Sequence, residues 1–209
     1  MQACPKTCWR QGIIIALAVV VGALATGCAP APWVSGGPRV GVDRDGTTAR
    51  PGIDIEALEQ RIHQLANHER VKRGLTPLAW NPVVHQVARR HSRDMARRHY
   101  FAHLSPEGHD LAYRYSQQGF VCQIQVGSAV YMGSENIYET SLYEARDYVG
   151  EVVTRTYWKD LETIAQTIVK GWMSSPTHRR NLLEPSWQTH GIGVAISGDD
   201  RVYATQDFC

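Results

Sequence analysis

The feature that most constrains the fold is a change in hydrophobic period along the chain. Between residues 54 and 98, apolar residues recur at three- and four-residue steps, which is typical of amphipathic helices. Near the end, GIGVAIS alternates apolar with small residues, GDDR turns the chain and VYATQDF continues extended, which predicts a terminal β-hairpin. Helices first, strands interspersed and an antiparallel hairpin last indicate an α+β layered domain.

Three helices are predicted from this periodicity. The first begins after Asp54 and ends at Gly74, and the second runs from about Pro82 to Arg98. The third is expected over residues 154–173, where Trp158, Leu161, Ile164, Ala165, Ile168 and Trp172 would share one side. These aromatic side chains are interpreted as core packing.

The second helix carries histidine and arginine on opposite faces. His91 falls on the apolar stripe, where a hydrogen-bonded core histidine is more common than a ligand. Arg90, Arg93 and Arg97 fall on the other face. This arginine stripe is interpreted as a solvated helix face, and contact with membrane headgroups or nucleic acid is the alternative.

The first 27 residues resemble a targeting segment. Lys6 and Arg10 precede an apolar run over residues 13–25, which is shorter than the roughly 20 residues that span a bilayer as a helix. LATGC, ending at Cys28, resembles the bacterial lipobox, in which the cysteine becomes acylated, although Ala25 replaces the usual Leu or Val. A plain signal peptide or an uncleaved anchor is the alternative. Residues 28–53 are rich in Pro and Gly and are interpreted as a tether to a domain over residues 54–209.

Cysteine use fits an exported protein. Cys4 and Cys8 would leave with the signal segment, and Cys122 and Cys209 would remain as a pair. An oxidising compartment permits a disulfide between them, and two unrelated thiols are the alternative.

Charge and motifs exclude several functions. Lys6 and Arg10 account for the whole excess of 22 Lys and Arg over 20 Asp and Glu, so no nucleic-acid partner is expected. The only His-Glu pair, in HERVK at residues 68–72, lacks the second histidine of zincin proteases. No Gly-x-Ser-x-Gly elbow, phosphate-binding loop or Cys-x-x-Cys zinc knuckle occurs beyond the signal segment.

Four further stretches occur in order: ANHERVKRGLTPLAW (66–80), YFAHLSPEG (100–108), GSENIY (133–138) and GWMSSPTHRRNLLEPSWQTHGIGVA (171–195). Together they resemble the CAP superfamily of cysteine-rich secretory, antigen 5 and pathogenesis-related proteins, in its bacterial SCP-like branch. The resemblance implies a three-layer α-β-α sandwich with a central antiparallel sheet. It also implies a cleft that many members line with two histidines and two acids.

Carried over by position, the cleft residues are His103 in FAHLSP, Glu135 in SEN and His178 in SSPTH. The fourth position departs from the family, because Trp172-Met173-Ser174-Ser175 lacks the glutamate that eukaryotic members carry three residues after the tryptophan. Glu135 and Asn136 could instead hydrogen-bond loop backbone. His109 is interpreted as a surface residue, and Ser105-Pro106 and Ser175-Pro176 as turn or helix-start signals.

The function expected from these features is a non-catalytic binding domain, exported and held by lipid in a bacterial cell envelope. In a Gram-negative cell this would be the outer membrane or the periplasmic face. The cleft would take a small ligand, lipid, sterol, cell-wall fragment or divalent ion, and no cofactor is required. The alternative is a metal-assisted hydrolase in which His103 and His178 hold zinc or another divalent cation and Glu135 acts as base.

Overall fold

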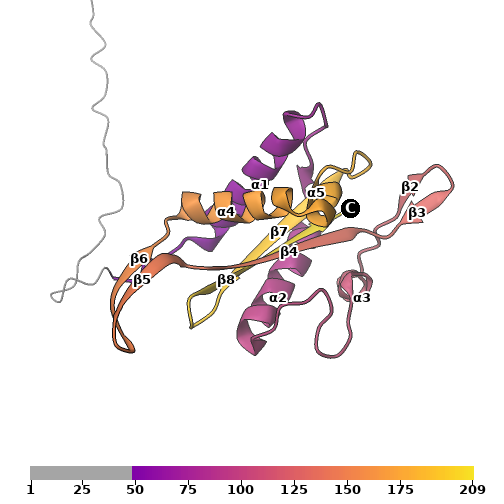
Figure 1. The fold of residues 1–209 in the computed structure, drawn as a ribbon. Helices are drawn as coiled ribbons and strands as arrows, with labels where there is room; N and C mark the ends of the chain where they lie inside the picture. Colours follow the sequence, from indigo (N-terminus) through magenta and orange to yellow (C-terminus); the bar gives the residue numbers. More distant parts are fainter. Residues whose placement is uncertain (1–48) are drawn as a thin grey trace, which may run out of the picture. The chain divides into compact units, whose positions relative to one another are not determined.

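A computed structural model describes residues 49–209 of the chain (Figure 1). The predicted signal segment, Cys28 and most of the predicted tether lie outside the described residues. Within residues 49–209, no helix is both long enough and apolar enough to cross a membrane.

Helices flank a central sheet, which confirms the predicted α+β class. The helices are α1 (Ile55–Val71), α2 (Pro82–Arg98), α3 (Leu111–Ser116), α4 (Leu161–Ser174) and α5 (Pro176–Leu182). The strands are β1 (Ala79–Trp80), β2 (Ile124–Val126), β3 (Ala129–Tyr131), β4 (Ser134–Ser141), β5 (Tyr143–Val149), β6 (Val152–Trp158), β7 (Thr189–Ile196) and β8 (Arg201–Phe208). The predicted positions of the first two helices and of the terminal hairpin are confirmed.

The central sheet has the strand order β1-β7-β8-β4. The β7–β8 and β8–β4 pairs are antiparallel, but β1 pairs with β7 in parallel. The sheet is therefore antiparallel, as expected, except at the β1 edge, which makes it mixed. The two residues of β1 lie in the connection between α1 and α2, so the path of that connection sets their direction.

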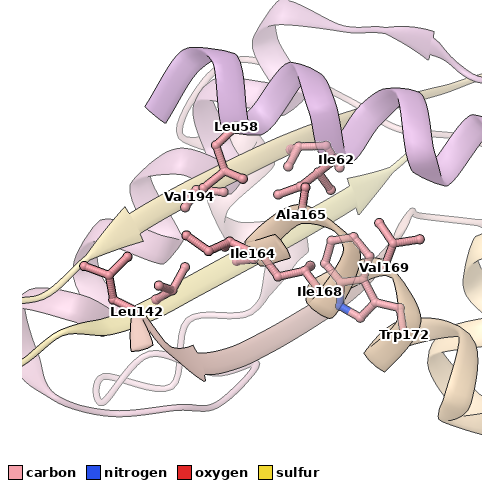
Figure 2. Packing of buried hydrophobic residues seen from close by; sticks show 12 residues of the cluster. Leu58, Ile62, Leu142, Ile164, Ala165, Ile168, Val169, Trp172 and Val194 are labelled. Atoms are coloured by element: carbon pink, nitrogen blue, oxygen red, sulfur yellow. The ribbon is translucent and has the colours of Figure 1, made fainter. Parts of the chain in front are cut away.

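Side chains alternate between the two faces of the central sheet along its strands, and each face carries its own hydrophobic cluster. Figure 2 shows the larger cluster, in which Leu58 and Ile62 of α1 and the apolar face of α4 pack on Val194 of β7. On the opposite face, Met95 of α2 packs with Ala195 and with residues of β4 and β8. Because successive side chains of a strand point to opposite faces, one register decides which residues meet α2 and which meet α4.

The helix predicted over residues 154–173 was wrong in its first part, because residues 152–158 form strand β6. This segment, VVTRTYW, is rich in β-branched and aromatic residues, which favour strands. The helix α4 begins only after Asp160, whose side chain accepts a hydrogen bond from the backbone N–H of Thr163 at 2.7 Å. The segment that holds Glu135 and Asn136 is likewise a strand, β4, and not a loop.

The predicted disulfide between Cys122 and Cys209 is confirmed. The two Cα atoms lie 5.6 Å apart and the residues are 87 positions apart in sequence. The bond ties the end of the chain, just after β8, to the segment that follows α3. In the chain-entropy view such a long loop closure stabilises the folded state by about 4 kcal/mol.

Two glycines of β7 let the backbone of α2 lie directly on the sheet. A Cβ at Gly193 would stand 2.0 Å from the backbone nitrogen of Arg89, and one at Gly191 would stand 2.1 Å from that of His85. Both obstacles are backbone atoms of α2, so no side-chain rotation could relieve the contact. The hydroxyl of Ser92 also donates to the carbonyl of Gly193 at 2.9 Å.

Gly193→Ala is expected to lower the free energy of unfolding by about 3 kcal/mol, because α2 would have to move away from the sheet. Urea unfolding measures the change. The matched control is Gly198→Ala, since a Cβ there meets nothing within 4 Å, and its effect should stay within about 0.5 kcal/mol. Equal effects of the two substitutions would show that α2 does not rest on Gly193.

Candidate functional site

The candidate site lies at the start of β4, an edge strand of the central sheet. Glu135 is buried there, on the same face of the sheet as Ile137, which packs against Met95 of α2. Asn136 points to the opposite face, where its amide donates to the backbone carbonyl of His178 at 3.0 Å. Glu135 and Asn136 therefore point to opposite faces of β4.

The fold brings His103 and Glu135 together. Nδ1 of His103 lies 2.8 Å from Oε1 of Glu135, so the ring nitrogen donates its proton to the carboxylate. The His103 side chain is 53% exposed, whereas that of Glu135 is only 5% exposed. The buried carboxylate thus orients the imidazole through Nδ1, and Nε2 is the ring nitrogen that Glu135 does not engage.

Arg114 occupies the other oxygen of Glu135, and the sequence analysis missed it. Its Nη2 donates to Oε2 of Glu135 at 2.5 Å. Its Nη1 donates to the backbone carbonyls of His103 at 3.0 Å and His109 at 3.2 Å. One guanidinium therefore neutralises the buried carboxylate and also holds the loop that carries His103. Asp110 begins the helix that presents Arg114, by accepting from the N–H of Tyr113 at 2.8 Å.

The charge on Glu135 is stabilised by its neighbours. Burial raises the pKa of this carboxyl, but the hydrogen bond from His103 and the charge of Arg114 outweigh burial. The pKa of Glu135 therefore lies below its ordinary value, and the group is ionised at neutral pH. Nε2 of His91 stands 3.9 Å from Oε2 of Glu135.

His91 is a buried and hydrogen-bonded histidine of α2. Its Nε2 lies 3.0 Å from the backbone carbonyl of Ala102, so this nitrogen carries the proton. Burial lowers the pKa of His91, which keeps the ring neutral. The interpretation of His91 as a hydrogen-bonded core residue is therefore confirmed.

Asp207 is a second buried acid that the sequence analysis did not single out. It is the direct cross-strand partner of Glu135 in the β4–β8 register, so the two side chains lie side by side on one face. Neither of its carboxyl oxygens has a hydrogen-bond partner in the described part of the chain. Burial, and then the charge of Glu135, raise the pKa of Asp207 well above its ordinary value. Glu135 is therefore the ionised member of the pair and Asp207 the protonated one.

His178 approaches from the other side of β4, on α5. Ser175 stands at the start of this helix and Pro176 is its first residue, as the sequence predicted. Burial lowers the pKa of His178. In the described part of the chain no hydrogen bond joins the His178 ring to Glu135 or His103. His178 is instead joined to β4 by its backbone carbonyl, which accepts a hydrogen bond from the amide of Asn136.

The ring of His109 lies against α3 and not against Glu135. It stacks on Tyr113 with centroids 3.7 Å apart, and the residue is half-buried. The interpretation of His109 as a surface residue is therefore only partly correct, because one face of its ring is covered.

The fourth cleft position falls near the end of α4, where Met173, Ser174 and Ser175 supply no acid. Within residues 49–209, no group of three or more His, Cys, Asp or Glu residues is arranged to hold a metal ion. The metal role of His103 and His178 stays a prediction.

The domain that carries this geometry matches a known family. The family model for the cysteine-rich secretory protein family, CAP, matches residues 63–208. The chain belongs to the CAP family. The matched range includes all four stretches on which the resemblance was based, and it also includes Arg114 and Asp207.

Two curated relatives of this CAP protein come from Bacillus subtilis (strain 168). YkwD, an uncharacterized protein, is 28% identical over 75% of this chain and 49% of its own length. YlbC, an uncharacterized membrane protein, is 33% identical over 72% of this chain and 34% of its own. This CAP protein thus spans about half or less of the curated relatives that it matches.

Two solved structures support the fold. An extracellular SCP-domain protein of Bacillus anthracis str. Ames is 27% identical, with a TM-score of 0.51 over 73% of this chain and 40% of that chain. An outer surface protein of Borrelia burgdorferi is 15% identical, with a TM-score of 0.54 over 75% of this chain and 94% of that chain. The second likeness concerns the fold alone.

The state of Asp207 predicts a pH-dependent effect. Because its folded pKa is raised, the unfolded chain releases a proton above about pH 4 that the folded protein retains, so stability falls as pH rises. Asp207→Asn removes this cost and should raise the free energy of unfolding at pH 7 by more than about 1 kcal/mol. The difference should vanish as pH falls below the ordinary Asp value of 3.8.

Urea unfolding between about pH 3 and pH 8 provides the measurement for Asp207→Asn. Glu151→Gln, an exposed carboxyl-to-amide change on the β5–β6 turn, is the control and should leave the pH profile unchanged. A loss of stability in Asp207→Asn that is the same at every pH would contradict a protonated Asp207.

Proposed function

We propose that this CAP protein is an exported, lipid-anchored binding protein whose cleft is formed by His103, Glu135 and His178. The ligand would be a small molecule, a lipid or sterol, a cell-wall fragment or a divalent ion. One observation supports binding above all: both oxygens of Glu135 are engaged, one by His103 and one by Arg114. A carboxylate held in this way orients an imidazole and carries its charge without reacting.

The hydrolase alternative makes demands that this arrangement does not favour. A general base must accept a proton from water at a free oxygen, and a base operates best when its pKa lies near the working pH. Glu135 is buried, paired with Arg114, and has a pKa below its ordinary value. Asp207 is protonated and has no access to solvent. The exposed chemistry of the cleft is that of imidazole, which suits recognition of a ligand.

Export is supported by three independent facts. The solved relative from Bacillus anthracis is described as an extracellular protein, and YlbC as a membrane protein. The Cys122–Cys209 disulfide suits an oxidising compartment. The apolar run before Cys28 is typical of a lipoprotein signal. Anchoring at the cell envelope through Cys28 accounts for these facts together.

Cys28→Ala is expected to release the protein from membranes, because diacylglycerol and acyl chains attached at Cys28 would supply the anchor. Cell fractionation with detergent phase partitioning measures the change. Cys8→Ala is the matched control, since Cys8 lies within the predicted signal segment, and it should leave the protein membrane-bound. Retention of the Cys28→Ala variant in the membrane would contradict the lipid anchor.

The cleft is expected to bind zinc more weakly than micromolar, because the second acid is missing and Glu135 is already paired. Calorimetric titration of the purified protein measures this. Tight zinc binding that disappears in His103→Ala and in His178→Ala, but persists in His109→Ala, would favour the hydrolase.

The same variants test ligand binding without metal. Binding of a fluorescent sterol is expected to weaken about tenfold in His103→Ala, because the ring forms the exposed wall of the cleft. His109→Ala serves as control, since that ring stacks on Tyr113. An unchanged affinity in His103→Ala would remove the sterol from the set of ligands.

A further inference from the structure

A basic hollow lies beside the cleft and is not explained by it. It has a volume of about 670 Å³ and is lined by residues of α2 and of the segment from Ser105 to Arg114. Figure 1 shows this segment and α3 beside α2. Five arginines line the hollow against two acids, Asp94 and Glu107; its remaining lining residues are Ser105 and two histidines, His91 and His109.

Some of these arginines are neutralised within the hollow. Arg98 binds Glu107 through two hydrogen bonds and also contacts Asp94. Arg97 contacts Asp94 as well. Arg114 is committed to Glu135. The two acids therefore account for Arg97 and Arg98 and leave no carboxylate among the described lining residues for the rest.

Arg90 and Arg93 have no partner in the described part of the chain. Both are exposed, and neither makes an ion pair or side-chain hydrogen bond within residues 49–209. Their spacing of three residues, with Arg97 four residues further, places the three guanidinium groups along one side of the helix. Other arginines of the domain are paired across elements, such as Arg61 with Glu162 and Arg201 with Glu139.

The helix dipole does not account for these two positions. Cations stabilise the last turn of a helix, where backbone carbonyls are unpaired, and this explains Arg97 and Arg98 at the end of α2. Arg90 and Arg93 stand earlier in the helix, where the dipole effect has faded. Their charge is therefore available to a ligand.

We propose that this hollow binds a phosphate group, held by Arg90 and Arg93 with Arg97 at its rim. Guanidinium groups match phosphate oxygens through paired N–H donors, and they are less strongly hydrated than ammonium groups. The group could belong to a phospholipid headgroup or to a free small phosphate. This site is separate from the cleft of His103, although Arg114 borders both.

The test is calorimetric titration of the full chain, solubilised in nonionic detergent, with inorganic pyrophosphate. Arg90→Gln/Arg93→Gln should bind at least about tenfold more weakly, because charge-assisted hydrogen bonds to phosphate are lost. Arg155→Gln/Lys170→Gln removes two positive charges from exposed positions outside the hollow and should bind like the unsubstituted protein. The thermal midpoint of each variant checks that it is folded.

Three results would overturn the proposal. The first is that the unsubstituted protein does not measurably bind pyrophosphate, and the second is that both double variants bind it equally weakly. The third is that citrate binds as tightly as pyrophosphate. His103→Ala should leave pyrophosphate affinity unchanged, so failure of the cleft function and failure of this site are distinguishable.

A second arm identifies the source of the phosphate. Detergent micelles containing phosphatidylglycerol should weaken pyrophosphate binding by competition if the headgroup is the natural ligand. Micelles containing phosphatidylglycerol that leave the affinity unchanged would assign the hollow to a free phosphate.

Discussion

The close contact between α2 and strand β7 sets the positions of the α2 side chains at both sites. Without side chains at Gly191 and Gly193, the helix backbone reaches the sheet, and Ser92 bonds to both Gly193 and Thr205. This contact fixes the rotation of α2 about its axis. His91 is thereby directed inward toward Glu135, and Arg90 and Arg93 are directed outward. One helix consequently contributes to a buried charge cluster and to an exposed basic surface.

A second contact fixes α2 against α1. Arg89 binds both carboxylate oxygens of Glu59, a buried residue of α1, and Glu59 also accepts from the backbone N–H of Val194. The buried acid thus connects α1, α2 and β7 in a single network. Breaking such a network by removing one partner would leave a buried charge unpaired, which is far more costly than losing an exposed pair. The rotation of α2 is therefore supported by charge as well as by packing.

Much of the fold was predictable, because helix and strand periods are local properties. The positions of α1 and α2 follow from apolar spacing, Gly74 and Pro82. Trp158 continues the apolar spacing of α4, and this spacing predicts a helix over residues 154–158, which instead form part of strand β6. The β-branched residues of that segment carried the opposite signal, and Asp160 marked the true start of the helix. Local propensity was here a better guide than the spacing of large apolar side chains.

Within the candidate site, only the residues that lie in the family's motifs were predictable. His103 and Glu135 stand in recognisable motifs, so their pairing could be expected. Arg114 lies 21 residues before Glu135 in a segment without a motif, and Asp207 meets Glu135 only through the β4–β8 register. No local pattern reports such contacts. The only local signal near Arg114 was Asp110, a helix-start residue that predicts a short helix but not the partner of its arginine.

The pairing of Arg114 also determines how the cleft and the basic hollow affect one another. Because Glu135 is ionised, it holds the guanidinium of Arg114 and cancels its charge where the two sites meet. Protonating Glu135, or replacing it with glutamine, would free that charge to act on the hollow. Asp207 reinforces the present state, since a protonated acid beside Glu135 adds no second negative charge for Arg114 to balance. The buried pair of acids therefore sets the charge at the border of both sites, although neither acid is exposed to a ligand.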